Sequence, residues 1–297
     1  MKFASWTGLD LKAALIDAGM VAEGDSLFNP SFVEENPRSL IVSIRKVSKA
    51  PGAPRSQLIF RVLNLGTSDS EVQKLREVTE LGGFRVRDMK LTKNHETDEI
   101  YATFNTGHQL RGNNILIAKL SNLDAPQVLD LLGRKRIEKN WSFFWREGNL
   151  FAIYSLFPLR VLRQVMSPAV SNVIQMETWL IRHRKSYLRA WTALGSQPIF
   201  VRGKILATFH YKPKFLLWRA YVPRLALIEL ETARVRVMRF SLPKGELSLH
   251  PSKLNWRAVA VNYASGLAVL QDKLILGLGQ RDDSFKMFEA DLEAEDW

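Results

Sequence analysis

The sequence predicts an all-β protein, a five-bladed β-propeller that forms one domain over residues 1–297, with a short N-terminal helix and a helical insertion around residues 159–194. The first reason is a recurring hairpin pattern, in which a charged or glycine-containing turn precedes an aliphatic residue and further β-favouring residues. The copies are Thr97–Phe104, Glu147–Tyr154, Arg202–His210, Gln271–Gly279 and, more weakly, Pro37–Arg45. The second reason is the spacing of these copies. The first aliphatic residues after the turns are Leu40, Ile100, Leu150, Ile205 and Leu274, and they are 60, 50, 55 and 69 positions apart. Such a period is typical of propellers, and a β-sandwich with accidental spacing is the alternative.

The segments between the copies complete the predicted units. Strands are expected at Phe84–Lys90, Leu225–Leu230 and Val235–Phe240, and Lys286–Leu292 is expected to close the last blade. Ser68–Leu81 begins with polar residues and has helical apolar spacing, which predicts a short helix. Leu159–Leu194 is long, aromatic and basic, and it predicts the insertion between blades. No linker of low complexity divides the chain, which favours one domain.

Composition excludes several classes of protein. The chain has no cysteine, which rules out disulfides, thiolate catalysis and cysteine-based zinc or iron–sulfur sites. The N-terminal segment contains Asp10, Lys12 and Asp17 and lacks the apolar stretch of a secretion signal. The most apolar run, Leu150–Leu159, is about half of the ~18 residues that a membrane span needs. We expect a cytoplasmic protein with no transmembrane segment.

Charge and motifs narrow the partners. A net charge of +12 and a pI near 9.9 favour anionic partners such as nucleic acid, a phosphorylated donor, acidic polysaccharide or a lipid surface. A solvated basic surface is the alternative. The sequence has no P-loop, Rossmann fingerprint, His-Glu-x-x-His motif or nucleophile elbow. The five histidines have no metal-ligand spacing, so neither a metal nor a cofactor is expected.

Polar residues near the ends of the repeated strands are the candidates for a site, because a radial fold gathers such positions around one funnel. Asp88 stands among basic residues and can act as general acid or base. A salt-bridged structural aspartate is the alternative. Lys139 and Asn140 offer a cation and an amide to a sugar that carries an anion. A capping asparagine beside a core tryptophan is the alternative for this pair.

Two further groups belong to the same set. His210, Tyr211, Lys212 and Tyr221 together can hold a phosphate through charge-assisted hydrogen bonds, although each is also an ordinary surface or core residue type. Asp282 can accept hydrogen bonds from sugar hydroxyls, although a glycine- and aspartate-rich turn explains it equally well.

The order of these positions resembles a known family, the five-bladed propellers of the β-mannoside phosphorylases and related β-mannosyltransferases, themselves similar to larger furanosidase-type propellers. The resemblance covers most of the chain and rests on the order and spacing of short motifs. The matching segments are Phe28–Ser31 with Arg45, Val86–Lys90, Glu138–Trp141 with Tyr154 and Pro158, Gly195–Pro198 with Thr208–His210 and Tyr221, and Tyr263–Leu267 with Gly279–Asp282.

The resemblance implies roles for individual residues. Asp88 matches the family's general acid. The implied substrate-binding residues are Asn29, Arg45, Lys90, Lys139, Asn140 and Asp282, and the implied phosphate-binding residues are Lys139, His210 and Tyr221. The chain departs from the family where a Glu-Asp-Pro-Arg strand reads Arg87-Asp88-Met89-Lys90, and where an arginine is replaced by Lys139. Because lysine lacks the bidentate geometry of arginine, the preference for mannose is not carried over.

We therefore expect an inverting glycosyltransferase or glycoside phosphorylase that binds a sugar or sugar phosphate with inorganic phosphate or a phosphorylated donor. Asp88 would move a proton at the glycosidic oxygen, directly or through a sugar hydroxyl, and an acidic surface polysaccharide is the favoured acceptor. One alternative is a glycoside hydrolase of the same propeller type, with Asp282 as second carboxylate. The other is a non-enzymatic propeller that binds acidic glycan or, less expected, nucleic acid through the basic and aromatic segment Arg182–Arg189.

Overall fold

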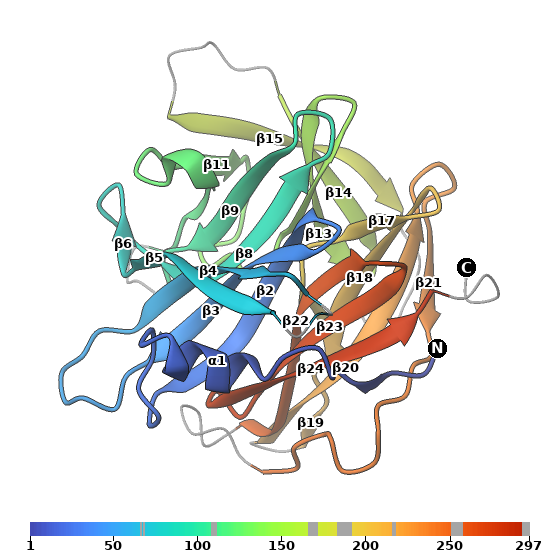
Figure 1. Ribbon diagram of the computed structural model, residues 1–297. Helices are drawn as coiled ribbons and strands as arrows, with labels where there is room; N and C mark the ends of the chain where they lie inside the picture. Colours follow the sequence, from blue (N-terminus) through green and yellow to red (C-terminus); the bar gives the residue numbers. More distant parts are fainter. Residues whose placement is uncertain are drawn as a thin grey trace.

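Antiparallel β-strands make up most of the chain, and the described residues contain one α-helix (Figure 1). The computed structural model describes residues 1–65, 67, 69–107, 112–165, 172–182, 192–215, 218–250 and 258–292. The predicted N-terminal helix is confirmed as α1 (Leu11–Asp17). The side chain of Asp10 caps it by accepting hydrogen bonds from the backbone amides of Lys12 and Ala13. No helix in these ranges is long and apolar enough to cross a membrane.

Antiparallel pairing groups most of the described strands into five units that follow one another along the chain, and parallel pairings join some of these units into larger sheets. The first unit is β2 (Ser26–Asn36), β3 (Ser39–Val47), β4 (Ser56–Leu63) and β5 (Glu71–Val78). The second is β8 (Arg87–Asn94), β9 (Glu99–Asn105), β10 (Ile115–Lys119) and β11 (Gln127–Leu131). The third is β12 (Ser142–Arg146), β13 (Asn149–Leu156), β14 (Leu159–Gln164) and β15 (Val173–Arg182). The fourth is β17 (Ile199–Val201), β18 (Lys204–Tyr211), β20 (Trp218–Glu229) and β21 (Arg234–Met238).

The last unit joins the two ends of the chain. It is β22 (Ala258–Leu270), β23 (Lys273–Gln280), β24 (Ser284–Asp291) and β1 (Ala4–Ser5). Lys286–Leu292 was expected to be the closing strand. Its strand β24 is instead the third of the four strands in this unit, because β1 pairs with the outer edge of β24 through Ala4 and Glu289. The minor elements are β6 (Glu80–Leu81), β7 (Phe84–Arg85), β16 (Thr192–Leu194), β19 (Lys214–Phe215) and a 3₁₀ turn at Leu120–Asn122.

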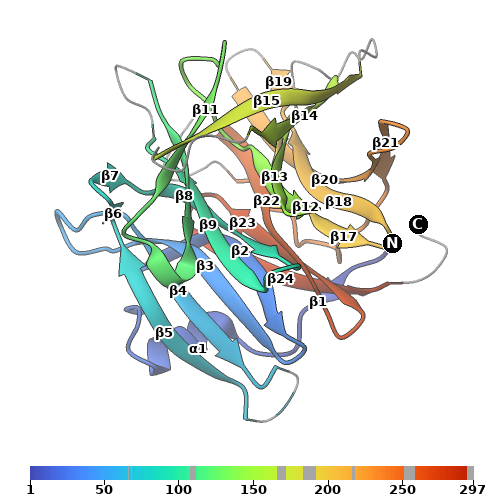
Figure 2. The same ribbon diagram turned by 90° about the horizontal axis from the view of Figure 1, so that it is seen from above.

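The first strands of the units face a common centre, which gives a propeller-like arrangement (Figures 1 and 2). β2 lies against both β8 and β22, β8 lies against β12, and β18 lies against β22. The third and fourth units meet where β13 contacts β16. Parallel pairings also join β11 to β15 and β20 to β22. Residues near the start of each inner strand therefore come close together although they lie far apart in the sequence.

The apolar core lies between neighbouring units. Separate clusters of buried side chains join the first unit to the second, the second to the third, the third to the fourth, the fourth to the fifth and the fifth back to the first. Phe32 packs at the centre against Gly266 and Gly277, where an added Cβ would lie 2.4 and 2.6 Å from its ring. The burial of apolar surface at every junction holds the units in place.

Two helix predictions are wrong. Ser68–Leu81 forms β5 and β6, because Val72 pairs with Val62 of β4 and the charged residues Lys74 and Arg76 occupy an exposed sheet edge. The expected helical insertion at 159–194 contains β14, β15 and β16, and its charged residues are cross-strand partners; Arg163, for example, donates to Glu177 at 2.8 Å. Residues 166–171 and 183–191 of this prediction, including most of Arg182–Arg189, lie outside the described residues.

The hairpin predictions were more accurate. Strands β3, β9, β13, β18 and β23 occupy the five predicted copies, and β20 and β21 cover the two further strands of the fourth unit. The strand expected at Phe84–Lys90 is divided into β7 and the start of β8, with Val86 outside both. This break lies next to Asp88 and is part of the local geometry described below.

A candidate active site in the central cavity

One cavity gathers polar side chains from all five units at the centre of the molecule. Its volume is about 220 Å³, and it is lined by Asn29, Arg45, Asp88, Lys139, Asn140, His210, Lys212, Tyr221, Val261, Tyr263 and Asp282. Every residue expected from the sequence to form the site lines this cavity except Lys90. The cavity itself is smaller than the ~300–1,000 Å³ typical of ligand pockets, so it suits a small ligand or one part of a longer one.

Unusual backbone geometry directs three of these side chains into the cavity. Asn29, Asp88 and Asn140 have φ values of 54°, 51° and 61°, in the left-handed region. The register of β2 against β3 shifts between Phe28 and Ser31, and that of β8 against β9 shifts between Arg87 and Lys90. Such bulges re-aim a side chain, and asparagine and aspartate tolerate the left-handed conformation better than other non-glycine residues.

Close backbone packing also fixes Asn29. A Cβ on Gly279 of β23 would lie 2.4 Å from Oδ1 of Asn29, so a larger residue there would displace the amide. Local strain of this kind persists when the surrounding structure holds it in place, and it is common at functional sites.

Asp88 is the central carboxylate. Nη1 of Arg45 donates to its Oδ1 at 3.0 Å, and Nδ2 of Asn105 donates to Oδ2 at 3.4 Å. Burial raises the pKa of Asp88, but the charges of Arg45, Lys139 and Lys90, with the hydrogen bond from Asn105, lower it below its ordinary value overall. The carboxyl group is therefore ionised at neutral pH, while its side chain remains 24% exposed and open to a ligand.

His210 and Tyr263 form a neutral wall of the cavity. His210 is 1% exposed, and neither ring nitrogen has a hydrogen-bond partner in the part of the chain that the structure describes. Burial, with the charges of Lys212 and Lys90, lowers its pKa well below the ordinary value, so the imidazole is neutral at pH 7. Tyr263 lies 4.7 Å from it between ring centroids and donates its hydroxyl to Oδ1 of Asn140 at 3.1 Å. Burial and the charge of Asp88 raise the pKa of Tyr263 well above its ordinary value.

Lys90 lies behind the cavity wall. It is 5% exposed, and its Nζ has no hydrogen-bond partner among the described residues. Burial lowers its pKa to about 8, against the opposing influence of Asp88. Lys90 therefore acts on the cavity through its charge, which lowers the pKa values of both Asp88 and His210.

The cavity includes Lys212, which the sequence analysis grouped with His210 and Tyr221, and Tyr263, which it did not single out as a site residue. Lys212 lies two positions after His210, and its Nζ is 5.5 Å from the ring centroid of Tyr221. Alternation along an extended segment places residues i and i+2 on one side, which agrees with His210 and Lys212 lining the same cavity. Tyr263 stands on the first strand of the last unit, and its position in the repeat was the available signal.

The arrangement suits an anionic ligand without a metal ligand set. Arg45, Lys139 and Lys212 supply positive charge, Asp88 and Asp282 supply carboxylates, and His210 supplies a neutral donor and acceptor. No group of three or more histidine, aspartate or glutamate side chains that could hold a metal ion occurs within the described ranges.

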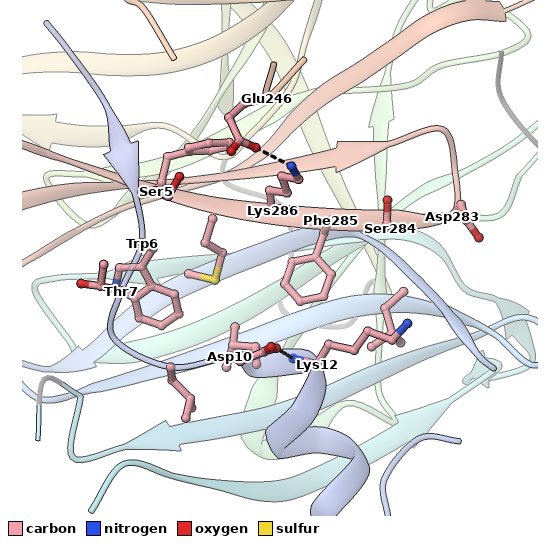
Figure 3. Close-up of a pocket in the computed structure, with 15 residues that line it drawn as sticks. Ser5, Trp6, Thr7, Asp10, Lys12, Glu246, Asp283, Ser284, Phe285 and Lys286 are labelled. Carbon is pink, nitrogen blue, oxygen red and sulfur yellow. Dashed lines mark hydrogen bonds and ion pairs between the residues drawn. The ribbon is translucent and has the colours of Figure 1, made fainter. Parts of the chain in front are cut away.

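A larger cavity elsewhere is less suited to chemistry. It has a volume of about 510 Å³ and lies between the N-terminal segment and β24, as Figure 3 shows. Several of its polar groups already have partners: Glu246 pairs with Lys286, Asp10 caps α1, and Asp283 accepts from the hydroxyl of Ser26 at 2.7 Å. The rest of its lining includes Trp6 and Phe285.

Comparison with solved structures places the fold. A β-1,2-mannobiose phosphorylase from Listeria innocua, solved with β-1,2-mannobiose, superposes with a TM-score of 0.59 at 14% identity and covers 92% of each chain. The chain shares the fold of the mannoside phosphorylases. A mannose phosphorylase from Leishmania mexicana, in complex with phosphate ion, gives a TM-score of 0.55 at 14% identity, over 95% of this chain and 92% of that one.

A glycosyl hydrolase from Bacteroides ovatus has the same fold, with a TM-score of 0.55 at 12% identity, over 90% of this chain and 85% of that one. No protein-family model matches the sequence, and no curated protein matches it. The similarity therefore lies in the arrangement of the strands rather than in the sequence.

Proposed function

We propose that the protein is a five-bladed propeller enzyme that transfers a sugar, with inversion, between a phosphate and a hydroxyl group of an acceptor sugar. The observation that carries the proposal is the meeting of an ionised Asp88 with Arg45, Lys139, Lys212 and the neutral ring of His210 around one cavity. A carboxylate supplies proton transfer, and fixed cations stabilise the charge of a phosphate that leaves or attacks.

In the direction of transfer, Asp88 accepts the proton of the acceptor hydroxyl, directly or through a hydroxyl of the donor sugar. The acceptor oxygen forms a bond to C1 while the bond from C1 to the phosphate oxygen breaks. The phosphate leaves with the electron pair toward Lys139, His210 and Tyr221. In the reverse direction, phosphate attacks C1, and protonated Asp88 returns the proton to the departing glycosidic oxygen.

The charge state of Asp88 in the free protein suits the role of the base that begins the transfer direction. Its neighbours lower its pKa, so it is a base in the free protein. A bound phosphate would offset the charge of Lys139 and raise the pKa of Asp88, which couples protonation of the acid to the presence of the co-substrate.

Solved neighbours support a sugar and a phosphate as ligands. The Listeria innocua structure contains a mannobiose and the Leishmania mexicana structure contains a phosphate ion. We assign the substrate as a hexose phosphate without choosing mannose, because Lys139 and Lys90 stand where the family has arginine.

Hydrolysis is the second candidate, because Asp282 lines the same cavity as Asp88. An inverting hydrolase uses a second carboxylate to activate water. The similarity in fold to a glycosyl hydrolase from Bacteroides ovatus supports this alternative.

One assay separates the two candidates. The purified protein is incubated with α-hexose 1-phosphates and a panel of sugar acceptors, and phosphate release and the anomer of the product are followed by NMR. Acceptor-dependent phosphate release with a β-linked product supports transfer. Hydrolysis of β-linked oligosaccharides in phosphate-free buffer, abolished by Asp282→Asn, would replace the proposal by its alternative.

A further inference from the structure

A second hollow opens beside the central cavity, between the third and fourth units. Its volume is about 540 Å³, and its walls are the loop between β11 and β12, the β13–β14 hairpin and strand β16. Lys139, Asn140 and Lys212 line both hollows, so the two lie next to each other. We call the second hollow the side groove. A sugar chain with one hydroxyl at Asp88 has space to continue along it.

The side groove is strongly basic. Lys135, Lys139, Arg160 and Lys212 line it, and Glu138 is the one carboxylate among its described lining residues. Glu138 is buried and already engaged, because it accepts from the backbone amide of Lys135 at 2.6 Å, the indole of Trp141 at 3.1 Å and the hydroxyl of Tyr154 at 2.9 Å. Its charge is therefore used to order the loop rather than to neutralise the lysines.

Two features prepare these cations for a ligand. The guanidinium of Arg160 lies 4.7 Å from the ring centroid of Tyr154, and its Nε and Nη2 donate to Oγ1 of Thr178 at 3.0 and 2.7 Å. This orientation leaves the Nη1 edge available and reduces the entropy lost on binding. Lys135 and Lys139 are exposed, and their ammonium groups have no hydrogen-bond or ion-pair partner in the described part of the chain.

The other walls suit a sugar ring. Tyr154, Phe157 and Pro158 offer apolar and aromatic surface, and Ser155 offers a hydroxyl. A volume of about 540 Å³ lies within the ~300–1,000 Å³ that ligand sites usually have. A neutral sugar would leave the charges of Lys135, Lys139 and Arg160 uncompensated, whereas an anionic sugar would pair with them.

We propose that the side groove binds an anionic sugar unit of the acceptor, bearing a carboxylate or a phosphate, next to the unit that reacts at Asp88. The proposal rests on the proposed function only for the direction in which the sugar chain runs, from Asp88 into the side groove. Binding in the groove itself does not require the reaction to take place. If the side groove binds such a unit, the acceptor of the reaction is an acidic glycan.

The test is calorimetric titration of the full-length protein in phosphate-free buffer with matched tetrasaccharides. The probes are β-1,4-linked tetramannuronate, neutral β-1,4-linked mannotetraose and mannotetraose with a single 6-phosphate. We expect at least one anionic probe to bind about tenfold or more tightly than the neutral probe. Tighter binding of tetramannuronate identifies a carboxylate ligand, and tighter binding of the phosphorylated probe identifies a phosphate ligand.

Variants locate the site. The double variant Lys135→Ala with Arg160→Ala should reduce the affinity for the anionic probe to that for the neutral one. If the double variant does not fold, Lys135→Ala alone is used, because Lys135 lies on an exposed loop. The control is Lys12→Ala with Arg38→Ala, which removes the same charge outside both hollows. Equal affinity for all three probes, or an equal loss in the control, would overturn the proposal.

The results distinguish a failure of the side-groove proposal from a failure of the proposed function. Tight anionic binding that is lost in the groove variants, in a protein with no transfer activity, supports the side groove and refutes the proposed function. Transfer to neutral acceptors with no preference for anionic ones does the reverse.

Discussion

The central cavity and the cavity beside the N-terminal segment (Figure 3) differ most clearly in the state of their polar groups. The central cavity is smaller, about 220 Å³ against 510 Å³, yet its wall includes His210 with both ring nitrogens unpartnered among the described residues. In the other cavity Glu246, Lys286 and Asp10 are already paired or capping. Of these two cavities, the larger is the one whose polar groups already have partners.

The difference has a physical reason. A buried polar group without a partner lowers stability, so native structures keep few of them. The left-handed backbone at Asn29, Asp88 and Asn140 adds strain at the same place. The central cavity thus concentrates features that oppose folding, and a bound anion would accept a hydrogen bond from the one N–H of neutral His210.

The largest expected difference between substitutions in the two cavities is in transfer activity. Asp88→Asn keeps the shape of the side chain but removes its basicity, so we expect transfer to fall by about 10²–10⁴-fold. Steady-state phosphate release measures this. The same change in the other cavity, Glu246→Gln, should leave the rate unchanged. Comparable losses in both variants would mean that the central cavity is not the reaction site.

The next difference is in stability. Burial lowers the pKa of Lys90 to about 8 from 10.5, so the unfolded chain binds more protons than the folded protein between these values. Charged Lys90 therefore destabilises the fold below pH 8, on the order of 3 kcal/mol, and this effect is lost as the pH rises toward 10.5. We expect Lys90→Met to be more stable at pH 7, with a gain that shrinks at alkaline pH.

Urea unfolding of both proteins at a series of pH values measures this gain. Lys286→Met in the other cavity should give none, because that lysine is partly exposed and paired with Glu246. A Lys90→Met protein less stable than the parent at pH 7 would show that the buried ammonium is stabilised by a partner.

Phosphate affinity offers a smaller contrast. His210→Phe removes both ring nitrogens but keeps an aromatic ring, so inorganic phosphate should bind about tenfold more weakly, as expected for the loss of one hydrogen bond to a charged ligand. Stability should hold or rise, because no polar atom is left unpaired. Calorimetry and thermal melting test both expectations, with Trp6→Phe as the control in the other cavity. Unchanged phosphate binding would remove His210 from the site.

The smallest expected effect is on the pH dependence. Arg45 is the strongest of the charges that lower the pKa of Asp88, so Arg45→Gln raises that pKa. Transfer requires ionised Asp88, and the acidic limb of its pH–rate profile should therefore move to higher pH. Arg61→Gln, whose partner is Glu35 at 2.6 Å, serves as the control. An unmoved acidic limb would assign it to another group.

Local sequence patterns were sufficient for much of the fold. Hairpins such as Glu147–Tyr154 have their turn and their alternation within a few residues, so nothing distant is needed to predict them. Glu71–Val78 was predicted as a helix because its apolar spacing suits both structures, and pairing with β4 decided the outcome. β1 could not be foreseen, because it is a two-residue strand that exists only where β24 meets it.

The sequence by itself determined which side chains are available for a site: aspartates, asparagines, cations and a histidine near the ends of the repeated strands. Tertiary structure alone decided their state. Packing of the five units buries Lys90 and His210, bulges turn Asn29 and Asp88 inward, and Arg45 reaches Asp88 from a different unit. Burial and charge proximity act across space, between residues that no local pattern connects, and they set the pKa values on which the proposed chemistry depends.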